Sequence, residues 1–436
     1  KRRPRTRGRR SVVPASRGGP CMARRAPSDT GARPRMPYAS AMPPAEHPAA
    51  TAASAPRPTE GRVAALYLHV PFCPSVCPYC DFHKMLRSEP LVARYLDRLE
   101  AEAAEVATAY PGPLDTVYLG GGTPSHLRDA ELERVFAALR RGWADADGRV
   151  GRLETTLEAD PLTFDARRLE LFRRLGVTRL SIGLQSSQDA VLAYLGRAHD
   201  AEAGLEAVRL ALASGMRVNV DVIMAVPGQR LADDLRTVLD LGVNHLSVYS
   251  LTIEPDTPFG RRGIVIDPDV DADAFELAGD VVAEYGLERY EVSNFARPGE
   301  ESLHNLAYWR GDRYLALGPG ASAYLPEGAF GTRTKNPPIK TWLLGAPPER
   351  DVLDADDVVL ERLMTGLRTR EGVDLARLEA RTGRALAAVA PAWLRDATRH
   401  GLLVLEGSVL RATPLGLERL DALLRAFVGS RASTPA

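Results

Sequence analysis

Short apolar runs alternate with longer amphipathic stretches from residue 62 onward. The runs are rich in β-branched residues, whereas the stretches between them repeat their apolar positions at helical spacing. This alternation predicts repeated βα units and therefore a parallel sheet. The expected strands are residues 65–70, 116–119, 154–157, 179–183, 218–223 and 245–251. The expected helices are residues 91–110, 129–141, 165–175, 201–214, 231–241 and 271–285.

Polar or glycine-rich residues follow the expected strands. That asymmetry is typical of a barrel whose binding site lies at the carboxyl ends of its strands. Six such units predict an α/β fold, a partial (β/α)6 barrel rather than a complete barrel of eight units. The segments that follow the second to sixth strands are residues 120–124, 158–161, 184–186, 224–229 and 252–255.

The rest of the chain divides around this barrel. Beyond residue 354, three helical patterns, a hairpin and a last helix at 414–427 resemble a winged helix in their order. We expect four regions, which are a disordered basic extension at 1–60, the barrel at 61–300, a segment packed on the barrel at 301–353, and a small winged-helix-like domain at 354–430.

Charge is distributed unevenly along the 436 residues, although the formal net charge is zero. Residues 1–60 hold 13 of the 56 basic residues, 3 of the 56 acidic residues and 11 prolines, which predicts disorder. We interpret them as an upstream extension of a chain that starts at Met22, Met36 or Met42. The alternatives are a nucleic-acid-binding arm and an organelle-targeting peptide, but the prolines interrupt the amphipathic helix that targeting needs. The other residues hold 43 basic and 53 acidic side chains, and an acidic body argues against nucleic acid as a ligand.

Hydropathy and cysteine content indicate where the protein works. No run of 18 or more apolar residues occurs, so we expect no membrane span, while peripheral contact with a membrane stays open. Three of the four cysteines are clustered, which indicates a reducing, cytoplasmic setting.

The clustered cysteines, Cys73, Cys77 and Cys80, form a C-x3-C-x2-C motif in the first loop of the barrel. A 4Fe-4S cluster normally takes four thiolates, so three leave one iron open. A zinc site with His83 as the fourth ligand is the alternative, although structural zinc usually draws its ligands from two separated places in a chain. A disulfide framework has no sensible pairing with the remote Cys21.

This cysteine spacing resembles that of the radical S-adenosyl-L-methionine (SAM) superfamily. The resemblance implies that the amino and carboxylate groups of SAM chelate the open iron, and that the reduced cluster cleaves SAM to a 5′-deoxyadenosyl radical. The barrel loops should then surround SAM with polar groups.

Several loop residues suit that task. The glycines at 120–122 let the backbone approach a ligand closely. Glu158 is placed to accept from the ammonium or a ribose hydroxyl, and Gln185 offers both a donor and an acceptor. Arg197 could pair with the SAM carboxylate, and Asp221 could accept from a ribose hydroxyl. Each side chain alone is more often a solvated or capping group, so their occurrence on one rim is the argument for a SAM site.

Longer runs resemble the oxygen-independent coproporphyrinogen III oxidase group. They lie at residues 67–73, 120–125, 157–161, 181–186, 195–199 and 221–229. The chain departs from that group at 224–226, where relatives usually carry an aromatic residue, Gly and Leu, and we expect local repacking there. The resemblance implies that SAM is bound by Tyr67, Tyr79, Gly121, Gly122, Thr123, Glu158, Gln185, Arg197 and Asp221.

Two features separate the oxidases from their relatives. The oxidases carry a further cysteine two positions after the third ligand, where this chain has Phe82. The run from His304 to Trp309, with the pattern H-N-x-x-Y-W, looks like the signature of HemW-type haem chaperones. That resemblance implies that the protein binds haem, with His304 in the binding motif. It also implies haem-accepting proteins as partners and allows a homodimer.

Other interpretations stay open at this point. His304 and Asn305 could satisfy backbone groups in a core segment while Trp309 fills space, and whether His304 binds iron is undecided. The rival functions are oxidative decarboxylation of coproporphyrinogen III, a radical SAM reaction on another substrate, and a zinc protein without catalytic activity.

Overall fold

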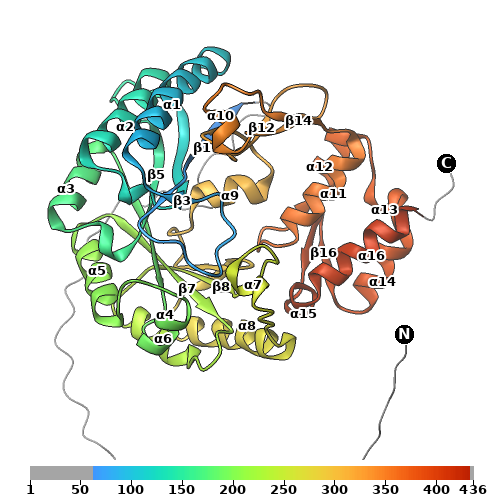
Figure 1. The fold of residues 1–436 in the computed structure, drawn as a ribbon. Coiled ribbons are helices and arrows are strands. Elements are labelled where there is room, and N and C mark those ends of the chain that lie inside the picture. The colour runs from blue at the N-terminus through green and yellow to red at the C-terminus, as the bar shows by residue number, and fades with distance from the viewer. Residues whose placement is uncertain (1–61, 433–436) are drawn as a thin grey trace, which may run out of the picture. The chain divides into compact units, whose positions relative to one another are not determined.

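The computed structural model describes residues 62–432, and a curved sheet surrounded by helices forms most of it (Figure 1). Six strands run parallel in the order β1-β4-β5-β6-β7-β8. All six predicted strands are confirmed, and the partial (β/α)6 barrel with them. They are β1 (Val63–Val70), β4 (Leu114–Gly121), β5 (Gly151–Ala159), β6 (Arg179–Gln185), β7 (Arg217–Met224) and β8 (His245–Ser250).

The sheet extends beyond these strands on both sides, to twelve strands in all within the described residues. A seventh parallel strand, β11, pairs with β1, so part of the segment 301–353 extends the sheet itself. The added strands are β9 (Glu288–Glu291), β10 (Asn294–Ala296), β11 (Arg313–Leu317), β12 (Ser322–Leu325), β13 (Thr332–Lys335) and β14 (Glu349–Val352).

The six predicted barrel helices also form, with ends that shift by up to three residues. Side-chain caps begin some of them, since Asp165 accepts from the N–H of Arg168 and Asp200 accepts from that of Ala203. They are α1 (Glu89–Ala109), α2 (Asp129–Trp143), α3 (Ala166–Leu175), α5 (Ala201–Ala213), α6 (Leu231–Leu239) and α8 (Pro268–Ala283). Shorter elements are β2 (Phe72–Cys73), β3 (Met85–Leu86), η1 (Pro124–His126), η2 (Pro161–Thr163), α4 (Asp189–Tyr194), α7 (Pro258–Arg261), α9 (Leu303–Arg310) and α10 (Ile339–Trp342).

The C-terminal domain has its own small sheet, ordered β15-β17-β16, and its own core around Leu363, Leu410 and Phe427. This confirms the winged-helix-like order, except that an additional short helix forms at Leu386–Val389 and the last helix divides into two at Arg419. Within residues 62–432, no helix is long and apolar enough to span a membrane. The elements of the domain are α11 (Ala355–Gly366), β15 (Val373–Asp374), α12 (Leu375–Thr382), α13 (Leu386–Val389), α14 (Pro391–Arg399), β16 (Leu403–Glu406), β17 (Val409–Ala412), α15 (Pro414–Glu418) and α16 (Leu420–Ala432).

A buried carboxylate closes the amino-terminal end of the barrel. Glu154 on β5 is 0% exposed and accepts hydrogen bonds from the backbone N–H groups of Leu303 and His304, which begin α9. Its carboxylate also lies 4.0 Å from Arg179 and 3.6 Å from Arg217, on the next two strands. Because a buried charge is stable only with such partners, Glu154 holds α9 against the strands.

Replacing Glu154 should therefore be strongly destabilising. We expect Glu154→Ala to lower the free energy of unfolding by about 3–5 kcal/mol, since the buried Arg179 loses its neighbouring carboxylate and the start of α9 loses its hydrogen-bond acceptor. Glu202→Ala is the control, because that side chain is exposed in its pair with Arg209, and it should change the value by less than about 0.5 kcal/mol. Urea denaturation of both variants measures the difference, and equal losses would contradict the role given to Glu154.

Candidate cluster and cofactor site

The cysteine motif lies on a loop fastened at both ends. Cys73 is buried in β2, which pairs with β3, while Cys77 and Cys80 are half-buried in the turn between them. The turn is closed by a hydrogen bond from the N–H of Cys80 to the carbonyl of Cys77, 3.3 Å long. The three thiols therefore sit on one short loop at the carboxyl end of β1.

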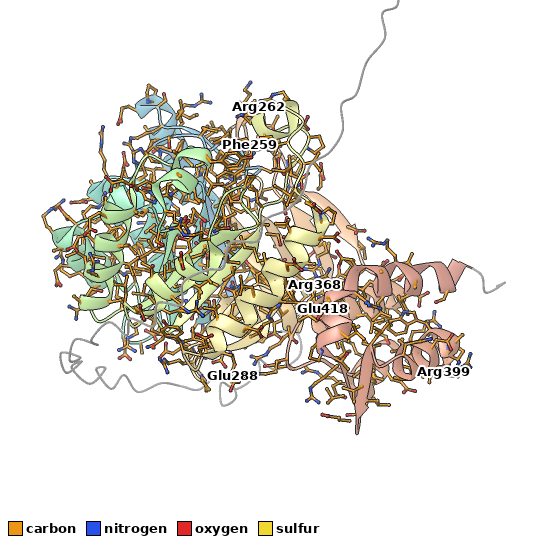
Figure 2. The ribbon with its side chains drawn as sticks, turned by 90° about the horizontal axis from the view of Figure 1, so that it is seen from below. Phe259, Arg262, Glu288, Arg368, Arg399 and Glu418 are labelled. Atoms are coloured by element: carbon orange, nitrogen blue, oxygen red, sulfur yellow. The ribbon has the colours of Figure 1, made fainter. Side chains whose placement is uncertain are left out.

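The far side of this loop rests on α7. The N–H of Phe259 donates to the carbonyl of Pro78 at 3.0 Å, and the ring of Tyr79 lies 6.4 Å from that of Phe259. Arg262 covers the same phenyl ring, with its guanidinium carbon 5.5 Å from the ring centre (Figure 2). Tyr79, one of the predicted site residues, thus packs beside the cysteines as expected from its position in the motif.

Cationic groups adjoin the thiols. Arg197 donates from Nη1 to Sγ of Cys77 at 3.4 Å, and Nζ of Lys84 donates to the carbonyl of Cys80. Burial raises the pKa of the Cys73 thiol to about 11, although a hydrogen bond with Thr123 partly offsets this effect. Burial also raises the pKa of the Cys80 thiol. Burial thus favours the thiol form of Cys73 and Cys80, whereas a bound metal or cluster and the nearby cations would favour the thiolates.

The three spaced thiols of this loop suit an iron–sulfur cluster. Within residues 62–432, no three His, Cys, Asp or Glu side chains converge on one point as the ligands of a single metal ion do. His83, the suggested fourth zinc ligand, accepts at Nε2 from the N–H of Ile339, 3.2 Å away. In a cluster each thiolate binds a different iron, so three spaced thiols on one loop suit that group.

The glycine-rich loop after β4 lies against the cysteine loop. The N–H of Gly122 donates to the carbonyl of Val70 at 2.8 Å, and that of Thr123 donates to the carbonyl of Phe72 at 2.9 Å. Gly121 has a φ of +112°, and a Cβ there would lie 2.5 Å from Nδ1 of His69. Only glycine allows this approach, which explains the glycines more directly than ligand contact does.

Glu158, at the end of β5, joins that loop to the barrel. One carboxylate oxygen accepts from the hydroxyl of Tyr118 at 2.9 Å, and the other accepts from the N–H of Gly121 at 2.8 Å. Burial, together with a smaller effect of the nearby Asp221, raises the pKa of Glu158 to about 7. The predicted residues Gly121 and Glu158 are therefore in direct contact.

Arg197 and Gln185 meet over Gly183, since a Cβ at Gly183 would lie 2.9 Å from Nε2 of Gln185 and 3.8 Å from Nη2 of Arg197. Gln185 has a φ of +73°, an unusual conformation for a residue with a side chain. Arg197 donates from Nη2 to Asp160 at 2.6 Å, while its Nε is buried without a partner. A ligand carboxylate would therefore compete with Asp160 for this guanidinium.

The remaining predicted residues lie nearby on β1 and β7. The hydroxyl of Tyr67 forms a hydrogen bond with Nδ1 of His69 at 3.0 Å. Asp221 accepts from Nδ2 of Asn219 at 2.7 Å, and burial raises the pKa of Asp221 to about 6. Burial thus favours the protonated form of both acids, Asp221 and Glu158.

Sequence reasoning missed several partners of these residues. Asp160 pairs with Arg197, Tyr118 holds Glu158, and His69 lies under Gly121. The sequence carried a signal for one of them, because Tyr118 stands two residues before Gly120 and thus on the same face of β4. Nothing in the spacing pointed to the pairing of Asp160.

His304 lies in the core, where it contacts Thr116 near the start of β4. It is 0% exposed, and Nδ1 forms a hydrogen bond with the hydroxyl of Thr116 at 2.9 Å while Nε2 forms one with that of Tyr308 at 2.8 Å. Burial lowers its pKa to about 4. Coordination of haem iron would require the ring to leave one of these partners, so haem binding by His304 stays a prediction.

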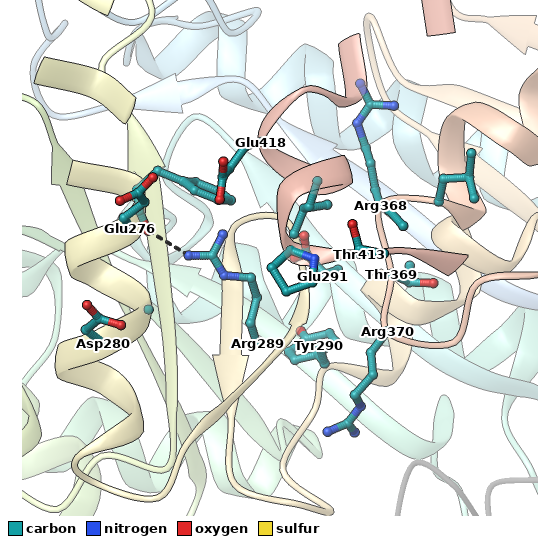
Figure 3. A pocket seen from close by; sticks show the side chains of 16 residues that line it. Glu276, Asp280, Arg289, Tyr290, Glu291, Arg368, Thr369, Arg370, Thr413 and Glu418 are labelled. Carbon is teal, nitrogen blue, oxygen red and sulfur yellow. Dashed lines mark hydrogen bonds between the residues drawn. The ribbon is translucent and has the colours of Figure 1, made fainter. Parts of the chain in front are cut away.

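A cavity of about 500 Å³ is found elsewhere, between α8, β9 and the C-terminal domain (Figure 3). None of the predicted site residues lines it. Arg289 of β9 donates from Nη2 to the carbonyl of Phe275 at 2.8 Å and lies 3.6 Å above that residue's ring. The guanidinium of Arg289, one of three arginines that line the cavity, is thus engaged in packing against α8.

Comparison with known proteins shows which superfamily has this fold and cysteine motif. Residues 67–241 match the family model of the Radical SAM superfamily, and residues 353–418 match that of the HemN C-terminal domain. The solved structure of coproporphyrinogen III oxidase (HemN) from Escherichia coli has the same fold, with a TM-score of 0.72 and 23% identity over 84% of this chain and 90% of that one.

Curated relatives define the family more narrowly. The chain is 33% identical to the heme chaperone HemW of Bacillus subtilis, over 83% of this chain and 98% of the relative. It is 35% identical to the heme chaperone HemW of Escherichia coli, over 83% of this chain and 97% of the relative. The chain therefore belongs to the HemW family of the Radical SAM superfamily.

The need for glycine at position 121 can be tested against a matched position. Gly112 has a φ of +113° but open space around a Cβ, so Gly112→Ala should lose only about 1 kcal/mol through backbone strain. Gly121→Ala adds the clash with His69 and should lose about 2–4 kcal/mol of unfolding free energy. Chemical denaturation compares them, and a Gly121→Ala loss no larger than that of Gly112→Ala would contradict the close approach.

Glu158 should also make stability depend on pH. Its folded-state pKa of about 7 exceeds the ordinary value of 4.5, so the folded protein holds a proton that the unfolded chain releases. Stability from this group is complete below pH 4.5 and is lost as the pH rises through about 7. Glu158→Gln should flatten this part of the stability profile in urea titrations between about pH 5 and 7. An unchanged slope would show that Glu158 titrates normally.

Proposed function

We propose that this protein is a haem chaperone that carries a 4Fe-4S cluster, binds SAM and haem, and delivers haem to haem-accepting proteins. The observation that carries the proposal is the identity of 33–36% with relatives named heme chaperone HemW, which extends over nearly the whole length of several of them. The cytoplasm suits the free thiols. A homodimer remains a prediction.

In this proposal, Cys73, Cys77 and Cys80 hold the cluster and leave one iron for SAM. When bound, the cluster and SAM together supply one-electron chemistry at the sulfonium of SAM. The chain would contribute the orientation of SAM. The residues proposed to position it are Tyr67, Tyr79, Gly121, Gly122, Thr123, Glu158, Gln185, Arg197 and Asp221.

The geometry assigns these residues different tasks. The N–H groups of Gly121, Gly122 and Thr123 are already used within the protein, so an ammonium would have to donate to carbonyl oxygens of this loop. Glu158 and Asp221 are acceptors held in fixed orientations by Tyr118 and Asn219. Together these groups offer acceptors to the ammonium and hydroxyl donors of a nucleoside amino acid.

Phe82 favours the chaperone over the oxidase. The position two residues after Cys80, where oxidases are expected to carry a further cysteine, holds a phenylalanine that is 66% exposed. No thiol of the described residues besides the three ligands can replace it, and Cys21 lies outside the described residues. A large exposed apolar ring beside the cluster loop also suits contact with a porphyrin plane.

One sample can test the proposal against its rivals. The purified protein is reconstituted anaerobically with iron and sulfide, analysed for metal, titrated with haem and assayed with coproporphyrinogen III, SAM and reductant. We expect a brown 4Fe-4S chromophore, stoichiometric haem binding and no protoporphyrinogen. Cys80→Ala should lose nearly all of the chromophore, whereas Cys21→Ser, the control, should keep it.

Three outcomes would contradict the proposal in different ways. Protoporphyrinogen formed at normal turnover would identify an oxidase. Zinc in place of iron, with no chromophore after reconstitution, would identify a zinc protein. A cluster-bearing protein that binds SAM but no haem would indicate a radical SAM enzyme for another substrate.

A further inference from the structure

The helix that carries the H-N-x-x-Y-W run lies inside the barrel. Its first N–H groups bind Glu154, near the start of β5, and its side chains reach Thr116, near the start of β4. In Figure 1, α9 occupies the middle of the ring of strands. The proposed SAM residues Gly121, Glu158 and Gln185 instead end their strands. The run is therefore located beneath the proposed SAM site.

His304 is locked in this place by two neighbours. Nδ1 pairs with Thr116 at 2.9 Å and Nε2 pairs with Tyr308 at 2.8 Å, so both ring nitrogens are used. The ring has no exposed surface. An imidazole held in this way is a rigid surface for packing and has no lone pair left for a metal.

The ring of Tyr118 stacks on His304, and the ring of Tyr308 meets it edge-on. The ring centres of Tyr118 and His304 are 5.2 Å apart with an interplanar angle of 29°, a stacked arrangement. The hydroxyl of Tyr118 donates to Glu158 at 2.9 Å, and Glu158 accepts from the N–H of Gly121 at 2.8 Å. A continuous series of contacts thus runs from His304 through Tyr118 to Glu158 and the glycine loop.

We propose that His304 is a positioning residue for the SAM site, which orients Glu158 by holding the ring of Tyr118 in place. This role rests on the proposed binding of SAM. In this role His304 lies beneath the proposed SAM site. The axial ligand of haem would then be a group other than His304. Loss of His304 lets Tyr118 tilt, and Glu158 then loses the donor that fixes its orientation toward the ammonium or ribose of SAM.

A double-mutant cycle tests the role. His304→Ala, Tyr118→Phe and the double variant are reconstituted anaerobically, and their SAM dissociation constants are measured by equilibrium dialysis. Each single variant should bind SAM about tenfold more weakly, since an oriented hydrogen bond to a carboxylate is lost. The double variant should stay within about twofold of Tyr118→Phe, because both changes act through the same bond. His400→Ala, at an exposed histidine of the C-terminal domain, is the control and should bind SAM like the wild type.

Haem binding gives a second measurement, which should not change in His304→Ala if His304 only positions Tyr118. We expect His304→Ala to keep the wild-type Soret maximum and the resonance Raman signature of its axial ligand. A changed axial-ligand signature would identify His304 as a haem ligand and overturn the proposal. Additive losses of SAM affinity in the double variant would also overturn it, since the two residues would then act separately.

A milder variant keeps the role testable if His304→Ala does not fold. Tyr308→Phe removes only the oxygen that binds Nε2 of His304, and it should weaken SAM binding about threefold. An unchanged affinity in this variant would contradict the role. Wild-type protein that binds no SAM would refute the proposed cofactor and this role together. Wild-type protein that binds SAM, alongside a His304→Ala variant of equal affinity, would refute the role alone.

Discussion

The two hydrogen bonds of Glu158 connect the parts of this site. The carboxylate ends β5 and accepts from Tyr118 below it and from Gly121 in the loop beside it. That loop is in turn bonded to the backbone of Val70 and Phe72, which lead into the cysteine motif. A buried acid without these donors would be costly, so the same bonds that satisfy Glu158 fix the glycine loop against the cysteine loop.

The barrel is therefore organised by polar groups at both ends. At the amino-terminal end, Glu154 and the arginines of β6 and β7 hold α9, although Glu154 and His304 are 150 residues apart in the chain. At the carboxyl-terminal end, the loops after the strands carry the thiols and the acceptors. Parallel strands make this division unavoidable, because all their carboxyl ends meet on one side. The aromatic rings of His304 and Tyr118 connect the two ends.

Much of this could be predicted because each βα unit carries its own hydrophobic period, and the glycine and acidic residues mark where strands end. β11 was missed although a Gly-Pro-Gly run follows it at 318–320, because a run of only five residues is a weak signal and its pairing with β1 spans 250 residues. The sequence predicted that Arg197 lies on the rim of the barrel, but it did not predict the hydrogen bond to Asp160. The hydrophobic period and the position of a residue in the sequence do not determine which donor reaches which acceptor. His304 shows the same limit. Its motif suggested a haem ligand, whereas in the structure both ring nitrogens form hydrogen bonds with buried neighbours.

The most direct test of the account is Mössbauer spectroscopy of the anaerobically reconstituted protein before and after SAM is added. Three cysteine ligands leave one iron open, so SAM should separate the signal of one iron from that of the other three. A spectrum without a 4Fe-4S cluster, or one that SAM leaves unchanged, would contradict the central claim that Cys73, Cys77 and Cys80 hold a cluster open to SAM.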